Sequence, residues 1–259
     1  MIDLHCHLLP GLDDGPADMP ETLEMARVAV MEGIDTIVAT PHIRDDHPFD
    51  PAAIRPLVDQ VNAALAAEGI GLKVLAGAEV ALTKVSELSD EELGRLCLGA
   101  GRHLLIESPY THATDLLEND LWTAQLRGFQ VVLAHPERSP SFQADLRRLA
   151  ALVERGVLCS ITAASMSGRF GKTVRRFTVR MLGEGLVHDV ASDAHGPVGR
   201  RPALMGGFEA LERELRGLRD AADWYTRAVP EAIVTGAEVP PRPERPARAR
   251  GLSRLLGGR

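Results

Sequence analysis

The sequence opens with Met1-Ile-Asp-Leu-His-Cys-His7, a short apolar run that leads directly into two histidines two residues apart. Successive side chains of a strand point to opposite faces, so residues two apart face the same side. His5 and His7 could therefore share one metal ion at the end of a first strand. The rest of the chain repeats this pattern: an apolar run is followed by a side chain that can bind metal.

Six further apolar runs follow the first. The full set is Met1–Leu4, Thr36–Ala39, Lys73–Ala78, Leu104–Ile106, Val131–Ala134, Leu158–Thr162 and Val187–Ala191. Helical periodicity separates them, most clearly in the apolar face formed by Ile54, Leu57, Val58, Val61 and Leu65. This alternation predicts a parallel α/β architecture, either an open doubly wound sheet or a closed barrel. No glycine-rich phosphate loop follows a run, which argues against a nucleotide-binding sheet.

Side chains that can bind metal follow six of the seven runs. They are His5, His7, His42, Glu79, Glu107, His135, Asp193 and His195. In a parallel barrel the carboxyl ends of the strands meet at one rim, which is where such folds carry their sites. Several imidazoles with carboxylates suit Zn, Mn or Fe better than Mg or Ca. Glu79 and Glu107 could bridge adjacent ions, so the pattern predicts a multinuclear site that holds a hydroxide.

Composition and charge exclude other classes of protein. The 259 residues include 29 Lys and Arg against 36 Asp and Glu, a net charge of −7. A chain with this excess of acidic residues does not supply the basic surface that binds nucleic-acid backbones, so we expect no nucleic-acid partner. No apolar run is long enough to span a bilayer, and three scattered cysteines fit a reducing compartment. No targeting segment precedes His5, and we expect a cytoplasmic location.

The composition changes near the C-terminus. From Glu238 onward the chain is rich in Pro and Arg, and such a stretch cannot bury a core. We therefore expect one metal-binding domain over residues 1–237 and a disordered tail over residues 238–259. The basic charge of this tail could contact an acidic partner or a membrane surface, although a solvated tail is the simpler interpretation.

Several short motifs also match a known family. They are Asp-Leu-His-Cys-His-Leu-Leu-Pro-Gly-Leu-Asp-Asp-Gly-Pro at 3–16, Ala-Thr-Pro-His at 39–42, Gly-Ala-Glu at 77–79, His-Pro-Glu-Arg at 135–138, Ser-Gly-Arg-Phe-Gly at 167–171 and Ser-Asp-Ala-His at 192–195. Together they resemble the PHP (polymerase and histidinol phosphatase) superfamily over roughly residues 1–205. Within it, the chain looks most like the bacterial manganese-dependent protein-tyrosine phosphatases associated with capsule and exopolysaccharide operons.

The resemblance implies a distorted (β/α)7 TIM-like barrel, the PHP fold, with three divalent transition-metal ions. Mn is the expected metal, with Fe, Co or Zn as alternatives. The implied ligands are His5, His7, Asp14, His42, Glu79, Glu107, His135, Asp193 and His195. Asp14 comes from the resemblance alone, because Asp-Asp-Gly at 13–15 is otherwise typical of a turn. Arg138 and Arg200 are the implied phosphate-binding cations, a role that suits the planar guanidinium.

The implied activity is hydrolysis of phosphotyrosine in proteins by attack of a metal-bridging hydroxide. The expected protein substrate is a tyrosine kinase of polysaccharide synthesis. A cysteine-nucleophile phosphatase is excluded, because the positions six residues after the cysteines hold Leu12, His103 and Ser165 instead of Arg. The alternatives are a small-molecule phosphatase of the same superfamily, such as a histidinol-phosphate phosphatase, and a non-catalytic metal-binding regulator.

Two features depart from the family pattern. The segment after His42 is acidic, although it would lie beside an anionic substrate, and Thr162 stands where relatives often carry Asn. Neither departure falls on an implied ligand.

Overall fold

Parallel strands form the centre of the computed structural model, which describes residues 1–47, 50–108, 110, 116–244 and 247–248. The central strands are β1 (Ile2–Cys6), β2 (Thr36–Ala39), β3 (His42–Ile43), β4 (Lys73–Ala76), β5 (Glu79–Ala81), β6 (His103–Glu107), β7 (Gln130–Ala134), β8 (Leu158–Thr162) and β9 (Asp189–Ala191). Each pairs in parallel with its neighbours, in the orders β1-β2-β4 and β3-β5-β6-β7-β8-β9. The predicted parallel α/β architecture is therefore confirmed.

The two sheets join into one closed barrel. β2 continues into β3 and β4 continues into β5, each after a two-residue interruption, so nine segments make seven strand positions. A parallel bridge between Cys6 and Ala194 connects β1 to the segment after β9. The amide of His7 donates to the carbonyl of Ala194 at 2.8 Å, which reinforces this closure. Of the two architectures left open by the sequence, the chain adopts the barrel.

The structure corrects two predicted strand limits, one of them at an interruption. The run Lys73–Ala78 is not one strand: β4 ends at Ala76, and β5 begins at Glu79. A Cβ on Gly77 would lie 2.7 Å from Val38 Cγ1, so close packing at this break requires glycine. The last strand is also shorter than predicted, beginning at Asp189 instead of Val187. The break at Gly77 places Glu79 beside His42, its partner in the β3–β5 pairing.

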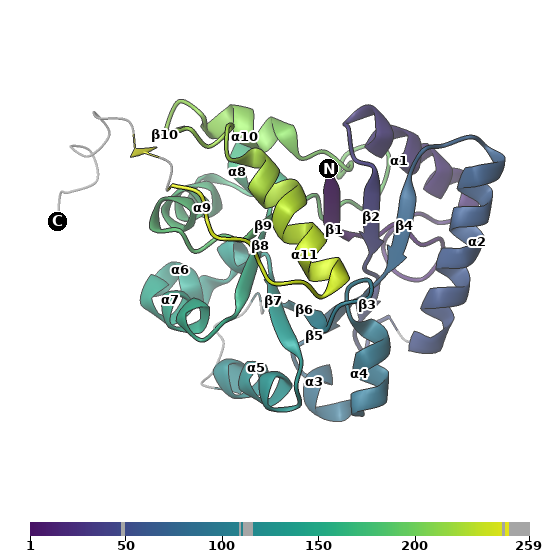
Figure 1. The fold of residues 1–259 in the computed structure, drawn as a ribbon, viewed down its shortest axis with the longest axis horizontal. Coiled ribbons are helices and arrows are strands. Elements are labelled where there is room, and N and C mark those ends of the chain that lie inside the picture. Colours follow the sequence, from purple (N-terminus) through teal and green to yellow (C-terminus); the bar gives the residue numbers. More distant parts are fainter. Residues whose placement is uncertain (48–49, 109, 111–115, 245–246, 249–259) are drawn as a thin grey trace.

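Helices surround the barrel on the outside (Figure 1). They are α1 (Met19–Met31), α2 (Ile54–Ala67), α3 (Lys84–Glu87), α4 (Asp90–Leu96), α5 (Leu116–Leu126), α6 (Pro140–Ala144), α7 (Leu146–Glu154), α8 (Ala163–Ser167), α9 (Lys172–Glu184), α10 (Met205–Leu211) and α11 (Val229–Thr235). The predicted apolar face of α2 buries Ile54, Val58, Val61 and Leu65. These side chains join the large apolar cluster that also contains Ile37 and Val74 of the strands. Burying such side chains supplies the main driving force for holding the helices on the barrel.

One helix closes the end of the barrel at which the strands begin. A second apolar cluster combines strand residues such as Leu4 and Leu105 with Val229 and Ile233 of α11. The amide of Ala100, which precedes β6, donates to the carbonyl of Val234 at 2.8 Å. In Figure 1, α11 crosses the strands of the barrel. This arrangement leaves the carboxyl ends of the strands free to carry a site.

Part of the Pro- and Arg-rich segment lies against the domain. The indole of Trp224 donates to the carbonyl of Pro240 at 3.3 Å, and the guanidinium of Arg242 lies 4.6 Å from the centre of that ring system. A short antiparallel pair joins β10 (Leu215–Arg216) to β11 (Ala247–Arg248). Residues 245–246 and 249–259 of the predicted tail lie outside the described residues. The domain limit at residue 237 stays a prediction.

None of the helices in the described part of the chain is both long enough and apolar enough to cross a membrane.

Candidate metal centre

The carboxyl end of β1 brings two histidines together in the way the first seven residues predict. Their Nε2 atoms lie 3.3 Å apart, and both side chains are buried. The pairing of β1 with β2 shifts between Asp3 and Cys6, since β1 advances three residues while β2 advances two. Such a bulge re-aims the side chains that follow it. Here it precedes the point at which His5 and His7 converge.

Glu79 lies at the centre of the surrounding imidazoles. Its carboxylate oxygens lie 2.7 Å from Nε2 of His135, 3.0 Å from Nδ1 of His42 and 3.2 Å from Nε2 of His5. Burial alone would raise the pKa of Glu79, but the imidazoles of His5, His135 and His42 hold it well below its ordinary value. Glu79 is therefore a buried carboxylate that stays charged among nitrogen ligands.

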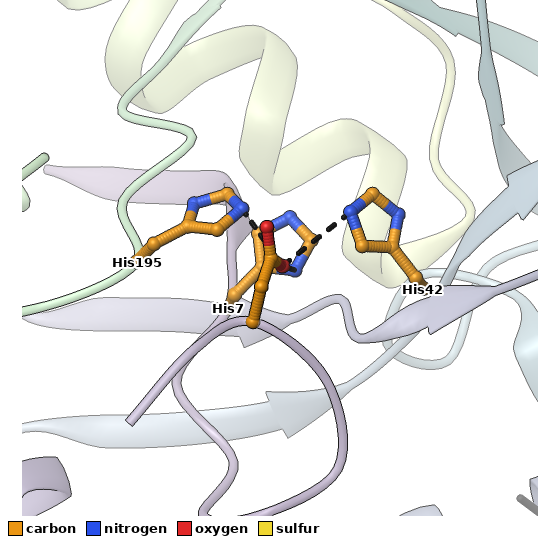
Figure 2. A group of neighbouring side chains, drawn as sticks. His7, His42 and His195 are labelled. Atoms are coloured by element: carbon orange, nitrogen blue, oxygen red, sulfur yellow. Dashed lines mark ion pairs between the residues drawn. The ribbon is translucent and has the colours of Figure 1, made fainter. Parts of the chain in front are cut away.

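A second corner of the centre forms around Asp14. Its carboxylate lies 3.2 Å from Nε2 of His195, 3.6 Å from Nε2 of His42 and 4.0 Å from Nδ1 of His7. Figure 2 shows these three histidines arranged around one carboxylate. Burial, together with nearby His7 and Arg200, lowers the pKa of His195 to about 3. Its imidazole is thus neutral at physiological pH, the form that binds metal.

All nine predicted ligands fall into four overlapping groups, each of which could hold an ion. The groups are His7, Asp14, His42 and His195; His5, His7 and Asp193; His5, Glu79 and His135; and His42, Glu79 and Glu107. Within each group the ligand atoms lie within 4.8 Å of one another. The structure therefore brings together the residues that sequence and resemblance selected, while their role as ligands stays a prediction.

The donor atoms fit a cluster of divalent cations. Glu79 Oε2 and His42 Nδ1 are buried and 3.0 Å apart, yet neither makes a hydrogen bond of good geometry. Buried polar atoms without partners are costly, and converging lone pairs of imidazole and carboxylate are relieved by a cation. Burial and the neighbouring charge of Glu79 raise the pKa of Glu107. The mixed nitrogen and oxygen set suits transition metals.

The backbone is strained at two of these residues. His135 and Asp193 have positive φ angles of 35° and 51°, and among the described residues they are the only non-glycine residues with positive φ. Such conformations cost free energy and persist where surrounding contacts enforce them. The amide of His135 donates to Ser160 and that of Asp193 to His5, each at 2.8 Å. Strain at the ends of β7 and β9 thus coincides with the proposed ligands.

Two arginines converge on the edge of this cluster. Nη2 of Arg138 lies 2.6 Å from Oδ2 of Asp193, and Nη2 of Arg200 lies 2.7 Å from the same oxygen. The other oxygen of Asp193 lies 3.6 Å from Nε2 of both His5 and His7. One carboxylate thus separates the imidazoles from two guanidinium groups. The two predicted phosphate-binding residues lie directly beside the predicted metal site.

Arg138 is held on three sides. It donates to Asp193 and to the hydroxyl of Thr162, and its guanidinium stacks on the ring of Phe170 at 3.9 Å. The side chain is only 9% exposed. Thr162, one of the two departures from the family pattern, therefore contributes to positioning this cation.

Sequence reasoning missed the role of Asp13, the first carboxylate of the Asp-Asp-Gly turn. Its buried carboxylate accepts from Nδ1 of His7 at 2.7 Å and from the amide of His42 at 3.0 Å. A Cβ on Gly15 would lie 2.6 Å from the carbonyl oxygen of His7, so the turn closes tightly under that histidine. Hydrogen bonding through Nδ1 fixes the orientation of His7 and leaves Nε2 facing the cluster.

Two cations pair with the acidic segment after His42. The guanidinium of Arg44, within the segment, pairs with Asp46, with Nε 2.9 Å from Oδ1, and Lys84 of α3 pairs with Asp45. Nη1 of Arg44 also lies 3.4 Å from Glu107. These ion pairs offset part of the acidic charge that the sequence places beside an anionic substrate.

The fold and this site define a parallel α/β barrel protein with a candidate polynuclear metal centre at the carboxyl ends of its strands. The model of a family described as capsular polysaccharide synthesis, CpsB/CapC, matches residues 1–226. The chain therefore belongs to the CpsB/CapC family, which confirms the predicted resemblance.

Named relatives agree with this assignment. The chain is 40% identical over 215 residues to tyrosine-protein phosphatase YwqE of Bacillus subtilis, covering 83% of this chain and 85% of YwqE. It is 26% identical over 224 residues to tyrosine-protein phosphatase CpsB of Streptococcus pneumoniae, covering 83% and 90% of the two chains.

Solved structures also share the fold. A crystal structure from work on YwqE and CpsB, described there as metal-dependent tyrosine phosphatases, superposes with a TM-score of 0.82 and 35% identity. The match covers 96% of this chain and 100% of that one. A dihydropyrimidinase from Brevibacillus agri matches with a TM-score of 0.50 at 12% identity, a likeness in fold alone.

Proposed function

We propose that this chain is a metal-dependent protein-tyrosine phosphatase, a phosphoric monoester hydrolase. One observation carries the proposal: Asp193 lies between two possible metal ligands, His5 and His7, and two arginines, Arg138 and Arg200. Metal ions beside paired guanidinium groups form a site for a tetrahedral dianion such as a phosphoryl group. The names of the relatives YwqE and CpsB support tyrosine phosphate as the ester.

The proposed cofactor is a cluster of three divalent transition-metal ions, Mn in the first place, with Fe, Co or Zn as alternatives. His5, His7, His42 and Glu79 each belong to two of the four overlapping groups. An imidazole nitrogen has a single lone pair, so the carboxylate of Glu79 is the shared group best suited to serve two neighbouring ions. The number of three ions is the one that the family resemblance implies. The ions, when bound, supply Lewis-acid stabilisation of phosphoryl oxygens and lower the pKa of a water molecule.

The side chains of the protein bind the phosphoryl group and hold one another in position. Arg138 and Arg200 bind the non-bridging phosphoryl oxygens and offset the negative charge that develops on them during hydrolysis. Asp193 holds both guanidinium groups in place, so little reorganisation is needed when the phosphoryl group arrives. The stacking of Arg138 on Phe170 keeps its planar fork facing the site. Asp13 holds His7 in one orientation through Nδ1.

The proposed partner is a phosphotyrosine protein, with a tyrosine kinase of polysaccharide synthesis as the expected substrate in the cytoplasm. The family description supports the link with capsular polysaccharide. Among the described residues, the ion pairs of Arg44 with Asp46 and of Lys84 with Asp45 offset part of the acidic charge beside the site.

Activity assays across metals test this proposal. Protein treated with chelator should lose activity toward a phosphotyrosine peptide, and added Mn or Co should restore it. Histidinol phosphate should be turned over far more slowly than the peptide. Full activity without metal would contradict the proposed cofactor, and a preference for histidinol phosphate would replace the proposed substrate with a small molecule.

A further inference from the structure

An aromatic side chain that the proposed chemistry does not use lies over the centre. Tyr110 follows β6, three residues beyond Glu107, and is 51% exposed. Its ring stacks on the imidazole of His135, with centroids 5.4 Å apart and an angle of 16° between the planes. Its hydroxyl oxygen lies 3.4 Å from Nε2 of His135. The hydroxyl end of the ring thus points to a proposed ligand atom, while much of the side chain remains open to solvent.

Nε2 of His135 cannot accept a hydrogen bond from this hydroxyl. The same nitrogen lies 2.7 Å from Oε1 of Glu79, a distance that requires it to donate its proton there. If it binds a cation instead, its lone pair is equally engaged. In both states the proton of the Tyr110 hydroxyl has no acceptor among the described residues. A phenol hydrogen in this position is available to an anion that enters the site.

The phenol also lies on the same side of the centre as a phosphate-binding cation. Arg138 belongs to the short turn that begins directly after His135, and its amide donates to the carbonyl of His135 at 3.0 Å. Burial raises the pKa of the Tyr110 hydroxyl, and the positive charge of Arg138 acts in the opposite direction. A phosphoryl oxygen held by Arg138 would therefore lie near a second donor.

We infer that Tyr110 is a substrate-binding residue: its hydroxyl donates a hydrogen bond to the phosphoryl group, and its exposed ring forms the wall against which an aryl group packs. This inference rests on the proposed function and deepens it by naming the residue that contacts both the phosphoryl group and the aromatic ring of the ester. In phosphotyrosine one oxygen separates phosphorus from the aromatic ring, so a phosphoryl group at the centre brings that ring to the mouth of the site. Aromatic rings attract one another at centroid separations of 4.5–7 Å.

Two substitutions separate the hydroxyl from the ring. Tyr110→Phe keeps the wall and removes the donor, so kcat/KM should fall about tenfold for aryl and alkyl phosphomonoesters alike. Tyr110→Leu removes both, and a further loss of about threefold should appear with p-nitrophenyl phosphate and a phosphotyrosine peptide but not with glycerol 2-phosphate. Calorimetric titration with inorganic phosphate should show about tenfold weaker binding to both variants. Metal content, measured by elemental analysis, should match that of the unchanged protein.

Trp122→Phe provides the matched control, since Trp122 is also half exposed and stacks on an arginine, Arg155, but lies on α5 outside the barrel. It should leave phosphate affinity and kcat/KM unchanged. An unchanged protein that is inactive with every metal would defeat the proposed function itself. If that protein is active and Tyr110→Phe matches it in phosphate affinity and turnover, the inference is overturned. Loss of metal in Tyr110→Phe would also overturn it, because Tyr110 would then support the metal site.

Discussion

The two ends of the barrel interior use the same strands for opposite purposes. At the end where the strands begin, Leu105 of β6 joins the apolar cluster that packs against Ile233 of α11. Two residues further along β6, Glu107 belongs to a group that could hold a metal ion. A strand of five residues thus contributes to both an apolar plug and a polar centre.

The difference separates stability from chemistry. The apolar end removes hydrocarbon from water and stabilises the fold. The polar end buries charged groups and contains the positive φ angles of His135 and Asp193, and both features cost stability. Substitutions at the two ends should therefore change different measured quantities, and each prediction below tests that separation.

The largest effect on chemistry is expected from Glu79→Gln. Glu79 belongs to two of the possible metal groups and contacts four histidines, so loss of its charge should remove at least one ion and more than about 99% of turnover. Glu107→Gln, at a more peripheral carboxylate beside Arg44, should have a smaller effect. Elemental analysis and kinetics measure both. Unchanged metal content in Glu79→Gln, as in the exposed control Glu91→Gln, would remove Glu79 from the centre.

The apolar end is tested by Ile233→Ala. This fully buried side chain should cost about 2–5 kcal/mol of unfolding free energy when truncated. Metal content and kcat/KM, measured well below the unfolding temperature, should stay unchanged. Chemical denaturation of the metal-loaded protein measures the free energy of unfolding. A large loss of metal in this variant would show that the two ends are coupled.

Arg138→Ala tests substrate binding without disturbing either apolar packing or ligands. It should cost about 2–4 kcal/mol of transition-state stabilisation while metal content is unchanged. Arg138→Lys should recover only part of this, since a point charge cannot reproduce the planar fork. Arg147→Ala, at an arginine that is 92% exposed, is the control. Efficiency near that of the control with both p-nitrophenyl phosphate and a phosphotyrosine peptide would exclude Arg138 from phosphate binding.

The smallest expected effect is that of Asp13→Asn. Asp13 touches the centre only through His7 and the amide of His42, so metal affinity should fall about 10- to 100-fold with the fold intact. Titration of metal-free protein with Mn measures this affinity. Asp59→Asn, at an exposed position on α2, should leave it unchanged. Equal affinities in the two variants would show that His7 does not depend on Asp13 for its orientation.

Local sequence patterns were enough to predict the strands and most of the candidate site. Apolar runs of three to six residues locate strands, and the parallel topology then brings their carboxyl ends together, which explains why eight candidate ligands could be selected before any fold was known. The position of a side chain directly after an apolar run thus indicates which other side chains it will lie beside in the barrel.

Long-range contacts set the limit of that prediction. Asp13 and Asp14 are identical neighbours, and contacts formed in the folded chain give them different environments: Asp13 accepts from the amide of His42, whereas Asp14 lies 3.2 Å from Nε2 of His195. The break that places Glu79 opposite His42 depends on how Gly77 packs against Val38. Tyr110 has no distinguishing motif, and its position over His135 arises only in the folded barrel.

Anomalous diffraction from crystals grown with Mn would show whether the carboxyl ends of the strands bind metal. We expect anomalous peaks among the four groups that contain His5, His7, His42 and Glu79, about 2 Å from their nitrogen and oxygen atoms. We also expect a peak next to the oxygen of Asp193 that faces away from Arg138 and Arg200. Active protein whose crystals show no peak at these residues, or peaks bound elsewhere on the molecule, would contradict the proposed metal centre.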